Sequence, residues 1–132
     1  TKRHRQLLDD MAETMYAADG VGLAAPQVGK SLRIVVIDVQ DEHGLLELVN
    51  PVITMREGSV TESEGCLSVP KVYGDVERAE RVTVEYTDRR SRRRTLTAEG
   101  LLARCIQHEC DHLEGRLFID IAVRLRKGEE EE

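Results

Sequence analysis

The stretch that most constrains this sequence is QHECDHLEG at residues 107–115, in which two histidines stand four positions apart. In a helix, His108 and His112 share one face, with their Cβ atoms about 5–6 Å apart. Both rings then reach a single ion at the usual distance of about 2.0–2.1 Å from nitrogen. Glu109 projects beside that ion, where a carboxylate can accept a proton from water. The pattern predicts a helix that carries two ligands of a metal site.

The surroundings of this pattern decide its meaning, because HExxH also arises by chance in charged helices. We expect a helix from about residue 98 to Gly115, with Glu99 in its first turn and glycine just past its end. Its apolar stripe consists of Leu101, Leu102, Cys105 and Ile106. Such a stripe indicates a helix that packs against a core.

A metal site needs a third protein ligand, which this helix does not supply. Cys105 lies about 10 Å from His112 at about 1.5 Å per residue, and Cys110 points to the opposite side. Cys66 is the candidate from elsewhere in the chain, because a thiolate binds metals at about 2.3 Å and Gly65 removes side-chain bulk beside it. A single cysteine is otherwise more often a small buried hydrophobe, and the missing ligand favours the metal interpretation.

Length and composition indicate one compact globular domain, since the chain has 132 residues, 40% apolar and 33% charged. The formal charge of −6 includes an acidic run, so we expect an acidic tail at 128–132 and no direct nucleic-acid partner. No apolar run approaches the roughly 18 residues of a membrane span, and there is no signal-peptide pattern. Three cysteines without a secretory signal favour reduced thiols and a cytoplasmic location.

The remaining periodicity predicts a helix followed by strands. Residues 5–18 have apolar positions at helical spacing, including a methionine pair that we interpret as core. Pro51 marks an edge or a bend between two strands, and the arginine-rich segment 89–94 is interpreted as a hairpin turn rather than a nucleic-acid patch. The expected strands are 32–39, 46–50, 52–57 and 82–87.

Three stretches together resemble the peptide deformylase family. They are GVGLAAPQ at 20–27, EGCLS at 64–68 and QHECDHLEG at 107–115, in the order and approximate spacing of that family. The resemblance implies an α+β fold with mixed, mainly antiparallel sheets around a central HExxH helix. It also implies a single catalytic domain over 1–127, with a shortened N-terminal strand and a shortened C-terminal helix.

The resemblance further implies the composition of the site. One divalent metal ion is expected, ferrous iron in the family with zinc, nickel or cobalt as substitutes, on Cys66, His108 and His112. Glu109 matches the general base and acid, while Gln27 and the backbone N–H of Leu67 match the oxyanion donors. The residues expected to contact substrate are Val21, Gly22, Leu23, Leu101 and Cys105. A supporting network is expected from Glu64, Arg78 and Asp111.

The implied activity is removal of the N-formyl group from formyl-methionyl nascent peptides, with release of formate. Ribosome association is a further family property, which the short C-terminal segment IAVRLRKGEEEE weakens. One alternative is a catalytically impaired domain in which the metal only supports the fold, although such a site needs neither Glu109 nor Gln27. Another is an HExxH metalloprotease, whose third ligand usually lies downstream, and no histidine follows His112.

Overall fold

The computed structural model describes residues 2–18, 20–66, 69–114 and 124–127, with the backbone alone described at 64–66, 69–74 and 124–127. Within these residues the elements form a five-stranded sheet in the order β1-β2-β3-β6-β7 and a three-stranded sheet in the order β4-β5-β8. The described pairings are all antiparallel. The element bounds are α1 (Lys2–Ala17), β1 (Gly22–Ala24), η1 (Ala25–Val28), β2 (Ile34–Ile37), β3 (Leu46–Glu57), β4 (Val60–Cys66), β5 (Val69–Arg78), β6 (Arg81–Thr87), β7 (Arg93–Glu99), α2 (Gly100–Leu113) and β8 (Arg124–Lys127).

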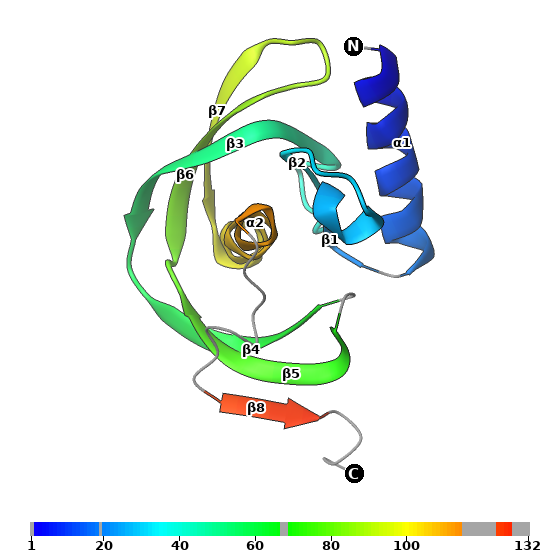
Figure 1. Ribbon diagram of the computed structural model, residues 1–132. Helices are drawn as coiled ribbons and strands as arrows, with labels where there is room; N and C mark the ends of the chain where they lie inside the picture. The colour runs from blue at the N-terminus through cyan, green and yellow to red at the C-terminus, as the bar shows by residue number, and fades with distance from the viewer. Residues whose placement is uncertain (1, 19, 67–68, 115–123, 128–132) are drawn as a thin grey trace.

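Helix α2 is the centre of the molecule (Figure 1). It is seen end-on between the curved five-stranded sheet and the β4–β5 hairpin, while α1 lies outside, beside β1 and β2. Chain connectivity explains the two sheets, because β4 and β5 form a hairpin inserted between the paired strands β3 and β6. The α+β fold with antiparallel sheets around a central HExxH helix is therefore confirmed.

The main core forms where α2 meets the five-stranded sheet. Leu102, Ala103 and Ile106 are almost completely buried and pack with residues of β2, β3 and β6 such as Val35, Leu48 and Val84. Aliphatic side chains dominate this core, in a chain with no Trp, one Phe and three Tyr. Burial of this apolar surface is the main contribution holding α2 to that sheet.

A second core cluster joins α1 to the other side of the same sheet. Leu8, Met11 and Met15 are buried against Leu23 of β1 and Ile34 of β2, among other residues. The methionine stripe of the first helix is therefore core, as predicted. Among the described residues, no helix is long and apolar enough to cross a membrane.

Several predicted boundaries were wrong. Helix α2 begins at Gly100, because residues 98 and 99 complete β7 and Gly100 adopts a left-handed φ of 62° at the junction. The strands predicted at 46–50 and 52–57 are one strand with a bulge, where Asn50 has a φ of 51°. Strand 32–39 is shorter, at Ile34–Ile37. Leu101, predicted in the apolar stripe, is 55% exposed.

The arginine-rich segment is a hairpin turn, as predicted, but its charges are paired with acids rather than only solvated. Arg92 and Arg94 contact Asp88, and Arg93 contacts Glu85. Arg89 binds Glu47 of β3 and Asp9 of α1. These pairs neutralise part of the arginine charge within the chain.

Candidate functional site

The two histidines of α2 lie close together. Both are buried, and their Nε2 atoms are 3.3 Å apart. Two nitrogens bound at about 2.0–2.1 Å in tetrahedral geometry would be separated by about 3.3–3.4 Å. The rings meet at an angle of 62°, with their centroids 5.0 Å apart. This pair therefore fits a tetrahedral metal ion without rearrangement.

Glu109 lies under strand β1, in a space that exists because residue 22 is glycine. It is buried on α2, next to His108 in sequence. A Cβ atom on Gly22 would lie 2.7 Å from Oε2 of Glu109 and 2.9 Å from its Cγ, which is closer than real contacts allow. Gly22 therefore makes room for the Glu109 carboxylate, a use that the sequence interpretation did not assign to it.

The Gln27 side chain is oriented by the backbone of its own turn. Its Oε1 accepts a hydrogen bond of 2.8 Å from the N–H of Ala24, at the entry to η1. Since the amide oxygen is held by this donor, the NH₂ group is the end that projects elsewhere. This hydrogen bond fixes the orientation of the amide, with its oxygen toward the Ala24 N–H.

The third predicted ligand is placed only through its backbone. Cys66 is the last residue of β4, where its register partner is Val69 of β5, next to a bulge. Its side chain, like that of Glu64, lies outside what the structure describes, and so does Leu67 with its predicted N–H donor. The ligand role of Cys66 and the donor role of Leu67 stay predictions.

A polar stripe on α2, consisting of Arg104, Gln107 and Asp111, faces the β4–β5 hairpin and was missed in part by the sequence interpretation. Asp111 pairs with the buried Arg78 of β5, which confirms that part of the predicted network. Gln107 accepts from the N–H of Ala79 at 2.9 Å and donates to its carbonyl at 2.8 Å. The spacing of three and four residues was visible in the sequence, but polar residues at that spacing normally face solvent.

The predicted substrate residues lie in different surroundings. Val21 is 41% exposed before β1, whereas the side chain of Leu23 is buried in the core cluster with α1, so that only its backbone is available to a ligand. Cys105 is buried one turn before His108, and Leu101 is exposed at the start of α2. β1 ends the order of the five-stranded sheet, which leaves an edge for an extended chain.

Cys110 does not share the position of the histidines. It packs against the main core, and burial raises the pKa of its thiol to about 12. That Cys110 takes no part in metal binding stays a prediction.

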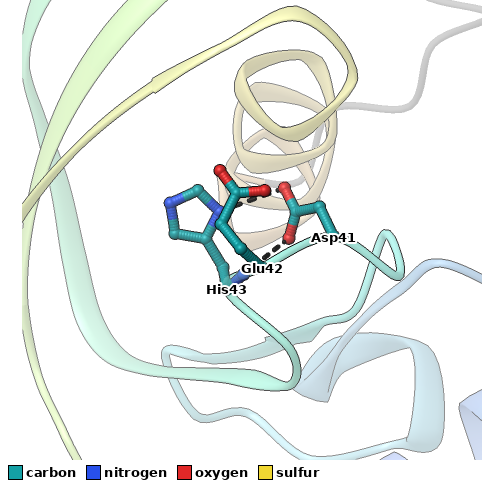
Figure 2. Close-up of side chains that lie close together, drawn as sticks. All are labelled: Asp41, Glu42 and His43. Atoms are coloured by element: carbon teal, nitrogen blue, oxygen red, sulfur yellow. Dashed lines mark hydrogen bonds and ion pairs between the residues drawn. The ribbon is translucent and has the colours of Figure 1, made fainter.

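One other group of metal-binding residue types lies on the loop after β2, formed by Asp41, Glu42 and His43 (Figure 2). All three are exposed, and their ligand atoms lie within 4.8 Å of one another. Local hydrogen bonds account for this proximity, because Asp41 accepts from the N–H of His43 and also contacts its ring at 3.0 Å. The same side-chain bond holds the pKa of Asp41 below its usual value. We interpret the cluster as a turn.

Comparison with known proteins agrees with this geometry. The family model for polypeptide deformylase matches residues 1–128. The peptide deformylase of Pelotomaculum thermopropionicum is 57% identical over 122 residues, which are 92% of this chain and 77% of the relative. The peptide deformylase of Halothermothrix orenii is 55% identical over 130 residues, covering 98% of this chain and 83% of the relative.

Solved structures show the same similarity. The peptide deformylase of Thermotoga maritima superposes with a TM-score of 0.89 at 41% identity, over 92% of this chain and 82% of that one. The enzyme of Synechococcus elongatus, solved in complex with actinonin, has a TM-score of 0.87 at 52% identity, over 91% and 67% of the two chains. By its sequence, its fold and the arrangement of its HExxH helix, this chain belongs to the peptide deformylase family.

Proposed function

We propose that this protein is a peptide deformylase that removes the N-formyl group from formyl-methionyl nascent peptides and releases formate. The observation that carries the proposal is the position of Glu109, buried beside the paired histidines and directly beneath the edge strand β1. A buried carboxylate in this position supports the proposed role of Glu109 as proton acceptor. Family membership supports the same activity.

The family implies a divalent metal ion, and we propose His108, His112 and Cys66 as its protein ligands. A bound divalent ion with an open position makes water nucleophilic near neutral pH. Ferrous iron is the proposed native ion, with zinc, nickel and cobalt as substitutes, because one thiolate and two imidazoles suit all of them. The 3.3 Å separation of the two Nε2 atoms supports the histidine part of this set.

The residues of the chain have two tasks in the proposed reaction, proton transfer and stabilisation of the developing negative charge. Glu109 takes a proton from the attacking water on its carboxylate and later returns it to the leaving amine. Gln27 donates from its NH₂ group to the oxygen of the formyl carbonyl as negative charge develops there, together with the N–H of Leu67. Loss of one such donor typically slows a reaction by about 10²- to 10³-fold.

We propose that the peptide binds as an additional strand along the edge of β1. The backbone of Val21 and Leu23 is available for this pairing, since β1 is a terminal strand of the five-stranded sheet. Gly22, Leu101 and Cys105 are the proposed neighbours of the methionine side chain. The exposure of Leu101 fits a position at the mouth of such a pocket.

We place the reaction in the cytoplasm, where formylated chains emerge from the ribosome. Cys105 and Cys110 are thiols outside any disulfide, which suits a reducing compartment. Direct docking on the ribosome stays a prediction, because the C-terminal segment concerned lies largely outside the described residues.

Formate release from a formyl-Met tripeptide tests the proposal, with metal-loaded protein handled without oxygen. We compare wild type with Glu109→Gln and with Glu114→Gln, which makes the same chemical change at the exposed end of α2. We expect Glu109→Gln to retain its metal and lose at least about 10²-fold in rate, while Glu114→Gln behaves as wild type. Metal-loaded wild type that releases no formate would instead favour the catalytically impaired domain.

A further inference from the structure

The proposed metal ligands come from two different parts of the fold. His108 and His112 are on α2, whereas Cys66 ends β4 in the three-stranded sheet. Among the side chains that the structure describes, the extensive apolar packing of α2 is with the five-stranded sheet. Something must therefore fix the position of the β4–β5 hairpin relative to α2 if three ligands are to meet at one ion.

Arg104 provides the most direct link between these parts. It is 7% exposed, and its guanidinium donates to the carbonyl of Val60 at 3.1 Å and to that of Glu62 at 2.9 Å, both in β4. It also donates to the carbonyl of Val76 in β5. One side chain of α2 thus holds both strands of the hairpin (the two strands labelled below α2 in Figure 1).

Arg104 also lies close in sequence to His108, and its hydrogen-bond partner Glu62 lies close in sequence to Cys66. Arg104 is four residues before His108, so the two side chains lie on neighbouring turns of one helix face. Glu62 is four residues before Cys66 in β4, about 13 Å away at about 3.3 Å per residue. The guanidinium therefore acts on the strand that leads to the proposed thiolate ligand, within one turn of the first histidine.

Arginine at this place both links α2 to the hairpin and satisfies backbone carbonyls of the hairpin. Removing a guanidinium from water costs free energy; an apolar residue would avoid that cost but would leave these carbonyls without the guanidinium. What an apolar residue lacks is direction, because packing tolerates sliding whereas hydrogen bonds to backbone carbonyls set a distance and an angle. Bonds to carbonyls also fix the strands themselves rather than their side chains.

We propose that Arg104 is a positioning residue of the metal site, which holds the strand carrying Cys66 in place relative to His108 and His112. This inference rests on the proposed ligand set. Loss of Arg104 should weaken metal retention more than it weakens the fold. Partners that orient metal ligands typically contribute about 10- to 100-fold to metal affinity.

The test measures how fast Zn²⁺-loaded protein loses its ion to EDTA, together with the denaturant midpoint of the metal-free protein. The variants are Arg104→Met, which keeps an apolar stem, and Arg104→Lys, which keeps a cation with fewer donors. Arg89→Met is the matched control, since Arg89 also joins separate elements through several hydrogen bonds but binds Glu47 and Asp9, outside the proposed site. If Arg104→Met does not fold, Arg104→Gln takes its place.

We expect Arg104→Met to release Zn²⁺ about 10- to 100-fold faster than wild type, Arg104→Lys to be intermediate, and Arg89→Met to retain the ion. Zn²⁺ release from Arg104→Met at the wild-type rate would overturn the proposal. It would also be overturned if Arg89→Met released Zn²⁺ as fast as Arg104→Met. A Cys66→Ser protein separates failure of the proposed ligand set from failure of the positioning role of Arg104. Zn²⁺ retained as tightly in Cys66→Ser as in wild type would show that the ligand set itself is wrong, and the positioning role with it.

Discussion

Helix α2 meets its two sheets in different ways. Toward the five-stranded sheet it presents Leu102, Ala103 and Ile106, which are buried among aliphatic side chains. Toward the β4–β5 hairpin it presents a polar stripe, in which Arg104 and Gln107 bond to backbone groups and Asp111 pairs with Arg78. Arg104 and Gln107 on the polar side are buried like the apolar side, and Asp111 is half-buried, so exposure does not separate the two sides clearly.

The difference teaches how stability and position are divided in this fold. Apolar burial is non-directional and roughly proportional to area, so it holds α2 firmly without fixing its exact placement. Hydrogen bonds are short and directional and contribute only about 0.5–1.5 kcal/mol each. We therefore expect changes on the apolar side to alter mainly the free energy of unfolding, and changes on the polar side to alter mainly the metal site.

The largest effect on stability is expected from Ile106→Ala. Ile106 is fully buried in the main core, and truncation of a buried isoleucine to alanine typically costs about 2–5 kcal/mol. Denaturant unfolding measures this loss, with Leu101→Ala as the control, because the exposed Leu101 should change stability by less than about 0.5 kcal/mol. A folded Ile106→Ala protein with wild-type stability but rapid metal loss would contradict the view that the apolar side of α2 mainly stabilises the fold.

Gly22→Ala is expected to lower activity without loss of metal. The added Cβ would overlap the Glu109 side chain, and a shift of about 1 Å in a catalytic group can cost about 10²-fold in rate. We expect kcat to fall more than KM rises, while metal content stays at one ion per chain. Unchanged kcat in Gly22→Ala would mean that the Glu109 carboxylate does not need the space that glycine provides.

Gln107→Leu is expected to have a smaller effect that separates the two sides of α2. The substitution introduces an apolar, helix-forming residue of similar size and leaves the N–H and carbonyl of Ala79 without the Gln107 amide, at a cost of about 1–3 kcal/mol. If the polar side fixes the metal site, Gln107→Leu should release Zn²⁺ faster than a variant of the apolar core that has the same free energy of unfolding. Chelator competition measures the two release rates. Equal rates would argue against the view that the polar side positions the metal site while the apolar side stabilises the fold.

The smallest effect is expected at the turn that joins β6 to β7, outside the two interfaces of α2 compared above. A hydrogen bond from the backbone N–H of Arg92 holds the pKa of Asp88 below its usual value. The folded protein thus binds this proton less readily than the unfolded chain, so the contribution is present above about pH 4 and is lost as pH falls through the folded pKa. Asp88→Asn should lower the denaturant midpoint slightly at neutral pH and converge with wild type in acid.

Much of this architecture was predictable because strong local patterns coincide with the elements. The HExxH helix, the first helix with Met11 and Met15, and the antiparallel sheets follow from periodicity together with the family resemblance. Boundaries failed where tertiary structure overrides local signals. Pairing with β6 carries β3 past Pro51, and pairing of β6 with β7 extends the strand to Glu99.

The sequence predicted the proposed catalytic and metal-binding residues better than the buried polar residues that bond α2 to neighbouring backbone. His108, His112 and Glu109 are brought together on α2 as the spacing predicts. Arg104 and Gln107 gave no clear signal, because a polar stripe on a helix usually indicates solvent. Their burial depends on a hairpin that folds over the helix from distant positions in the sequence, and residue types alone do not show this.

Cobalt spectroscopy tests the central claim most directly, because Co²⁺ reports both tetrahedral geometry and thiolate ligation. We predict that Co²⁺-loaded wild type shows the intense visible bands of a tetrahedral ion and a sulfur-to-metal charge-transfer band. The charge-transfer band should disappear in Cys66→Ser and remain in Cys110→Ser. A charge-transfer band that survives in Cys66→Ser, or that is lost in Cys110→Ser, would contradict the proposed joining of α2 and β4 at one metal ion.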